Sequence, residues 1–68
     1  MPAYVVVRDS DIRIVQVGLG PLQPVVKGFS AVEIVEEAAY KIDLADPWIV
    51  DGAPRLATAE EAALLQEP

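Results

Sequence analysis

Two groups of aspartates are the residues of this chain that suit a metal ion. Asp9 and Asp11 form one group, and Asp43, Asp46 and Asp51 form the other. Hard cations prefer carboxylate oxygens, but an EF-hand loop needs ligands at alternate positions, a central glycine and a final glutamate. Neither group has that pattern. We therefore predict no metal site, and we expect these aspartates to stabilise turns by hydrogen bonding to their own backbone.

Two glycines have the spacing that begins a dinucleotide-binding fingerprint. Gly18 and Gly20 fit its first positions, but Gln23 stands where the third glycine should be, and Pro21 replaces the start of a helix. We expect the glycines to supply backbone freedom at the end of a strand. Paired carboxylates for acid–base chemistry need a cleft, and nothing in the sequence predicts one. We therefore predict no catalytic residue and no cofactor.

Pro2 is a further candidate because it follows Met1 and leads into an apolar run. This opening resembles that of the tautomerase family, whose small subunits use an N-terminal proline amine as a base. The resemblance covers about the first seven residues, and it implies that Arg8 or Arg13 binds an acidic substrate. The chain departs from the family because Met1 would block the amine and a second strand precedes the long helix. Both arginines also adjoin aspartates, which favours solvated charges at strand ends.

Length and composition restrict the class of protein. With 68 residues, the chain forms a single domain over residues 1–68, near the size at which one core gives only marginal stability. It has no cysteine and no histidine, so disulfides and the usual zinc sites do not stabilise it. The hydrophobic content of 53% allows an efficient core or burial against other subunits, and we favour the second.

The net charge of −6 argues against a nucleic-acid partner, since proteins that bind phosphate backbones usually carry a basic face. No apolar run approaches the roughly 20 residues needed to span a bilayer. The sequence also lacks the basic segment followed by an apolar segment that is typical of a signal peptide. We expect a soluble, non-exported protein with no nucleic-acid and no membrane partner.

Four apolar stretches predict a small antiparallel sheet. Residues 3–7 and 12–17 are rich in β-branched side chains and are separated by a polar turn short enough for a hairpin. The second run alternates imperfectly, which predicts burial on both faces or a bulge. After a loop rich in glycine and proline, residues 25–27 predict a short edge strand. Residues 48–50, followed by an Asp-Gly turn, predict a fourth strand.

Residues 29–42 predict the main helix. Ser30 and Glu33 have the spacing of a capping box, and Phe29 and Ile34 are placed to form a hydrophobic staple. The apolar residues that follow recur at helical spacing and give a broad apolar face. The helix is therefore expected to pack on the sheet.

A second capping box, Thr58 with Glu61, predicts a short helix over residues 59–66 after an irregular stretch at 54–57. A helix of that length is not stable alone, so we expect it to dock or fray. The order of elements predicts an α+β fold: a β-hairpin plus one or two short strands, packed by one main helix, with a short C-terminal helix.

Several aromatic and apolar residues are candidates for contact with a partner protein. Trp48 suits a core and an interface equally, and Tyr4 and Tyr40 share this ambiguity. The proposed edge strand and the terminal helix add aliphatic side chains. The predicted partner-binding residues are Trp48, Tyr4, Tyr40, Val25, Val26, Leu64 and Leu65.

Taken whole, the chain resembles the small accessory proteins of tailed-phage particles, such as capsid cement or decoration subunits. The resemblance is one of length, composition and style, and VVKGFSAVEI and DPWIVDG are its most suggestive segments. It implies a non-enzymatic structural protein of the virion, acting as an oligomer. Such a subunit binds a capsid protein or a neighbouring virion protein and stabilises the lattice by added buried area.

The rival class is a free-standing cytoplasmic adaptor or regulatory module that caps a basic surface on another protein. Its binding should depend strongly on salt, whereas a cement protein held by apolar contact should depend on salt much less. An enzyme acting through Pro2 is the third class. The acidic residues of the adaptor would be Glu33, Glu36, Glu37, Glu60 and Glu61.

Overall fold

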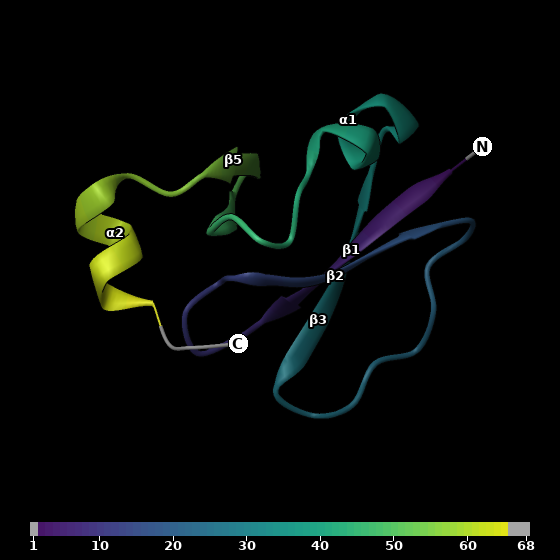
Figure 1. Cartoon of the computed structure of the whole chain (residues 1–68). Coiled ribbons are helices and arrows are strands. Elements are labelled where there is room, and N and C mark those ends of the chain that lie inside the picture. Colours follow the sequence, from purple (N-terminus) through teal and green to yellow (C-terminus); the bar gives the residue numbers. More distant parts are fainter. Residues whose placement is uncertain (1, 66–68) are drawn as a thin grey trace.

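The computed structural model describes residues 2–65, which form two small antiparallel sheets and two short helices (Figure 1). The α+β class is therefore as the sequence predicts. Neither helix in this part of the chain is long and apolar enough to cross a membrane. In chain order the elements are β1 (Ala3–Arg8), β2 (Ile14–Leu19), β3 (Phe29–Ile34), α1 (Glu36–Lys41), β4 (Trp48–Asp51), β5 (Ala53–Leu56) and α2 (Ala59–Leu64).

Strand β1 is the centre of the larger sheet, whose order is β2-β1-β3 with both pairs antiparallel. Val17 and Val32 flank Val5 on one face, where Val5 is completely buried. Helix α1 contacts β1 and β2, and β4 also packs against this face through Trp48 and Val50. We call it the core face. The opposite face of the sheet is covered by segment 20–28, which joins β2 to β3.

The β1–β2 hairpin contains the irregularity that the imperfect alternation predicts. The register shifts between Val6 and Val7, and the turn that follows places Ile12 at φ +55°. This left-handed conformation is unfavourable for a β-branched residue. The Ile12 carbonyl accepts a hydrogen bond from the Val50 amide at 3.2 Å. The turn is therefore the place where the second sheet joins the first.

Strands β4 and β5 form a hairpin that turns at Gly52, whose φ of +75° needs a glycine. Ile49 of β4 is 2% exposed and bridges Arg13 just before β2. The predicted strand over residues 48–50 and its turn are confirmed. The prediction that residues 54–57 are irregular is wrong for the residues of β5, because a two-stranded sheet tolerates Pro54 at its margin.

The predicted main helix over residues 29–42 is wrong. Residues 29–34 pair with β1 along their whole length, because alternating side chains beside a buried strand outweigh a local capping signal. The Ser30 hydroxyl does not cap a helix; it donates to Asp9 Oδ1 at 2.7 Å. Helix α1 begins only after Val35, which forms no side-chain cap. Helix α1 has six residues, as α2 has, so neither is the main helix that the sequence predicts.

Residues 25–27 are not a strand, so that prediction is also wrong. They lie near the end of segment 20–28, just before Gly28, which has a φ of +97°. The Phe29 amide donates back to the Val26 carbonyl at 3.2 Å. Prolines 21 and 24 cannot donate to a sheet ladder, which keeps this segment off the edge of β2. The third strand of the sheet is β3 instead.

The second helix begins as predicted, and Thr58 and Glu61 form both hydrogen bonds of the capping box. Helix α2 ends at Leu64, before the predicted limit at residue 66, which lies outside the described residues.

Replacing Val35 by serine tests where α1 begins. Val35 is 70% exposed and has N-cap geometry, so Val35→Ser should supply the missing cap and raise the free energy of unfolding by about 0.5–1 kcal/mol. Urea denaturation measures the change. Ser30→Ala is the control, and it should cost little because it removes an exposed hydrogen bond and no cap. A helix running through residues 29–42 would give the reverse, with a loss at Ser30 and no gain at Val35.

Candidate functional site

An apolar groove lies between the three-stranded sheet and segment 20–28, on the face opposite the core face. Its volume is about 300 Å³, and none of the described residues that line it is charged. The segment arches away from β2 before it returns to β3 (Figure 1). The walls are formed by Tyr4, Val6, Val15, Gln16, Gln23, Pro24, Val25, Val26 and Phe29.

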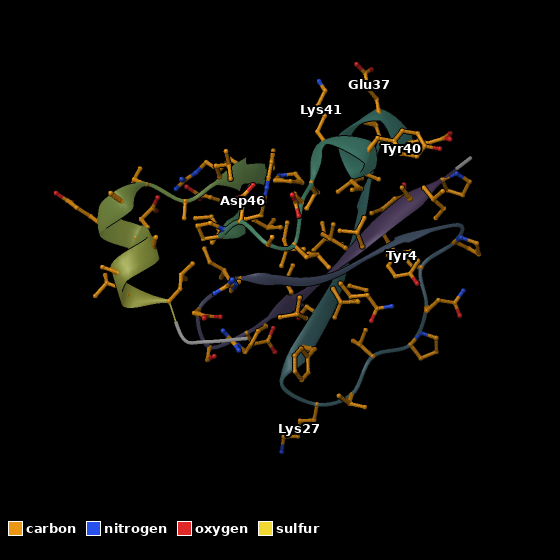
Figure 2. The ribbon with its side chains drawn as sticks, viewed as in Figure 1. Tyr4, Lys27, Glu37, Tyr40, Lys41 and Asp46 are labelled. Atoms are coloured by element: carbon orange, nitrogen blue, oxygen red, sulfur yellow. The ribbon has the colours of Figure 1, made fainter. Side chains whose placement is uncertain are left out.

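Tyr4 forms part of the floor of this groove because Gly18 lies directly opposite it on β2. A Cβ atom at position 18 would overlap the ring and hydroxyl of Tyr4. Gly18 therefore provides the space in which the aromatic ring packs, and Tyr4 is only 9% exposed. In Figure 2 the Tyr4 side chain lies beside the segment that follows β2. Sequence reasoning attributed Gly18 to backbone freedom and missed this packing role.

The rim of the groove carries two of the predicted partner-binding residues. Val25 and Val26 are 38% and 71% exposed, and they face the same hollow as Tyr4. Phe29 lines it from the start of β3, although the sequence had placed it in a helix staple. The structure thus joins three predicted residues and one missed aromatic residue in one apolar surface.

The other four predicted partner-binding residues lie apart from the groove. Tyr40 is exposed on α1, and its hydroxyl donates to Glu36 Oε1 at 2.7 Å, which raises the pKa of Tyr40. Figure 2 shows Tyr40 beside α1, away from Tyr4. Trp48 packs partly buried against the core, and Leu64 and Leu65 lie at the end of α2, Leu64 being strongly exposed.

Helix α2 has no buried residue and is held to the smaller sheet by an ion pair. The guanidinium of Arg55 donates to both carboxylate oxygens of Glu61 at 2.8 Å. Glu61 also accepts from the Thr58 amide at 2.9 Å. The hydrogen bonds from Arg55 and then from Thr58 lower the pKa of Glu61 to about 2. Both side chains of the ion pair are more than a third exposed, so salt should weaken it.

Asp11 and Asp43 act as turn residues, as the sequence predicts, whereas Asp9 accepts from the Ser30 hydroxyl and Asp51 from Arg55. Asp11 accepts from the Arg13 amide at 3.3 Å, and both of its oxygens also accept from Arg8. Asp43 accepts from the Ala45 amide at 2.9 Å. Among residues 2–65, no three carboxylates gather in a way that suits a metal ion.

The residues that the tautomerase resemblance requires are not brought together. Pro2 precedes β1, whereas Arg8 ends it, and six residues of strand span about 20 Å. Arg13 lies beside Arg8, since the Arg8 amide donates to its carbonyl at 2.9 Å. The Pro2 carbonyl accepts from the Gly20 amide at 2.7 Å. Met1 lies outside the described residues.

The glutamates considered for an acidic adaptor are distributed over β3, α1 and α2, and the two helices lie on separate sides of the molecule (Figure 1). Glu37 pairs with Lys41 at 3.7 Å, and Glu61 pairs with Arg55. These carboxylates therefore do not form one continuous acidic face. Comparisons with protein-family models, curated proteins and solved structures give no match.

The contact between Tyr4 and Gly18 can be measured by a double-mutant cycle. Gly18→Ala should displace the Tyr4 ring and lower the free energy of unfolding by about 1–3 kcal/mol, the usual cost of overpacking. In a Tyr4→Ala background the added methyl group meets no ring, so the same change should cost much less. Equal costs in the two backgrounds, measured by urea denaturation, would show that the ring does not pack on Gly18.

The ion pair of α2 predicts a loss of helix docking in acid. The folded-state pKa of Glu61, about 2, lies below its ordinary value of about 4.3. Its contribution is therefore complete above about pH 5 and is lost as the pH falls towards 2. A carboxyl titration followed by NMR should show Glu61 titrating well below the ordinary range of a glutamate, and Arg55→Gln should raise the pKa of Glu61. A normal pKa for Glu61 in the unmodified protein would contradict the ion pair.

Proposed function

We propose that this chain is a non-enzymatic assembly protein that binds a larger protein structure through its apolar groove. The observation that supports this most is that the described residues lining the groove are all uncharged, in a chain with a net charge of −6. Depletion of charge and enrichment of aromatic residues are typical of the buried centre of a protein interface. Tyr4 and Phe29 supply the aromatic residues, and Val26 supplies an exposed apolar rim.

The groove is small, and this argues for binding to a repeated structure. A hollow of about 300 Å³ accommodates only a few side chains, so one contact of this kind gives modest affinity. Several copies that bind neighbouring sites gain avidity without new contacts. A lattice presents such sites at fixed spacing, as a single soluble partner does not.

The biological setting that we propose is the virion of a tailed phage, with this chain as a capsid cement or decoration subunit. The support for it is the resemblance in length, composition and style, together with the uncharged groove. The partner would be a capsid protein or a neighbouring virion protein. The subunit would stabilise the lattice by burying apolar surface on it.

Sedimentation of an extract from the native source tests this proposal. The tagged protein should sediment with a large particle and stay there at about 1 M salt, because apolar contact persists where surface charges are screened. Val26→Glu should release it, since the change puts a carboxylate on the rim of the groove. Val35→Glu is the matched control, because Val35 is 70% exposed and lies outside the groove, and it should leave sedimentation unchanged.

Two results would contradict the assembly proposal. One is a protein that stays at the top of the gradient at every salt concentration. The other is a complex that dissociates in salt and is insensitive to Val26→Glu, which would favour the cytoplasmic adaptor bound by its glutamates.

A further inference from the structure

The outer edge of β3 is a free edge of the larger sheet. β3 is the last strand in the order β2-β1-β3, and α1, which follows it, makes its main contacts with β1 and β2. Within the described residues, no strand pairs with β3 on its outer side. Apart from the Phe29 amide, which donates to the Val26 carbonyl, its outward backbone groups are therefore available to another strand.

The ladder with β1 shows which residues direct their backbone groups outward. The Asp9 amide donates to the Gly28 carbonyl at 2.9 Å, so these two residues form a hydrogen-bonded pair next to the pair of Arg8 with Phe29. Hydrogen-bonded pairs alternate along an antiparallel ladder. The backbone groups of residues 30, 32 and 34 thus point to β1, and those of Phe29, Ala31 and Glu33 point outward.

This edge has few of the features that prevent strand pairing. Natural edges are blunted by proline, lysine, bulges or a covering element. β3 has no proline, no lysine and no register shift, and Glu33 is its only charged residue. Phe29, Ala31, Val32 and Ile34 are only partly buried, so a second strand would cover apolar surface as well as backbone groups.

We propose that β3 pairs with β3 of a second copy of this chain, antiparallel and about a two-fold axis normal to the sheet, with Val32 facing Val32. The result is a continuous six-stranded sheet. Such an axis keeps each face of the sheet on the same side in both copies, and the interface is isologous because each copy contributes the same strand. A foreign strand is the alternative occupant, but the match of the edge with itself in length and hydrogen bonding favours a second copy.

Hydrogen bonding selects this register over its neighbour. With Val32 on the axis, Ala31 faces Glu33 of the second copy, and these residues satisfy each other's outward N–H and C=O groups. With Ala31 on the axis, Glu33 would face Phe29, whose amide already donates to the Val26 carbonyl. The Glu33 carbonyl would then lack a donor, which is unfavourable at an interface.

Side chains agree with the same register. Glu33 lies across from the small and uncharged Ala31, so the two glutamates do not face each other directly. On the core face, Ser30 lies across from Ile34, and the two Val32 side chains meet on the axis. Opposed apolar side chains of this kind stabilise a sheet pair. The net charge of −6 on each copy opposes association, so salt should strengthen the dimer.

Self-pairing does not depend on the proposed capsid partner, because its central pairs involve Ala31, Val32 and Glu33, none of which lines the groove. If Val26→Glu no longer sediments with a large particle but still forms the dimer, the substitution has affected the groove alone. A monomer that still binds a large particle would overturn the dimer and leave the assembly function in place.

Light scattering and sedimentation equilibrium of the full chain over a range of concentrations test the proposal. The expected species has twice the chain mass of 7.3 kDa, and its population rises with salt. Ala31→Pro removes an outward N–H while the ladder to β1 stays intact, so it should weaken the dimer at least about tenfold. Ala31→Thr is the control: it keeps the N–H, suits a strand and should preserve the dimer.

A pair of charge substitutions tests the register and does not depend on how proline is tolerated. Ala31→Lys places an ammonium across from Glu33 twice per dimer and should tighten it about three- to tenfold, whereas Ala31→Glu should weaken it by a similar factor. The circular dichroism of both variants should match that of the unmodified chain. A protein that is monomeric at all concentrations, a dimer indifferent to Ala31→Pro in a folded variant, or equal effects of lysine and glutamate would overturn the proposal.

Discussion

The structure depends on burying β1 on both faces. All of its residues from Ala3 to Val7 are buried, and a chain of 68 residues has no second layer large enough to cover both sides uniformly. Helix α1 and the β4–β5 hairpin cover the core face, while segment 20–28 covers the other. Because that segment arches, it leaves a groove over Tyr4. The candidate binding surface is therefore a direct consequence of how a small chain covers an apolar central strand.

Local signals in the sequence predicted the elements that depend on nearby residues. The β1–β2 hairpin, its irregular register, the Gly52 turn and the capping box of Thr58 involve partners only a few positions apart. Residues 29–34 carry an equally clear helical signal, yet their conformation is set by β1, more than twenty positions away. Ser30 shows the difference: its hydroxyl serves Asp9 across the sheet and not the first turn of a helix. Pairing with a buried strand outweighs such preferences.

The same limit applies to the candidate site. Tyr4, Val25 and Val26 could be selected because exposed or ambiguous apolar residues suggest contact with a partner. These residues line one groove with Phe29 because of the path that segment 20–28 takes. Two prolines and Gly28 shape this path, but no pattern in the sequence specifies it. The role of Gly18 likewise needs the hairpin register that sets it opposite Tyr4. Chemical type was predictable from the sequence, but proximity was not.

The groove and the free edge of β3 become related if both proposals hold. Phe29 belongs to both, since it starts β3 and lines the groove. A two-fold axis normal to the sheet does not exchange the two faces, so both grooves of a dimer would open on the same side. The two copies could then engage two neighbouring sites of one repeated surface, and the second contact would form at a high effective concentration. The pairing of β3 would thus supply a second binding site. Two grooves, each too small to bind firmly alone, would then be enough to hold the subunit on a lattice.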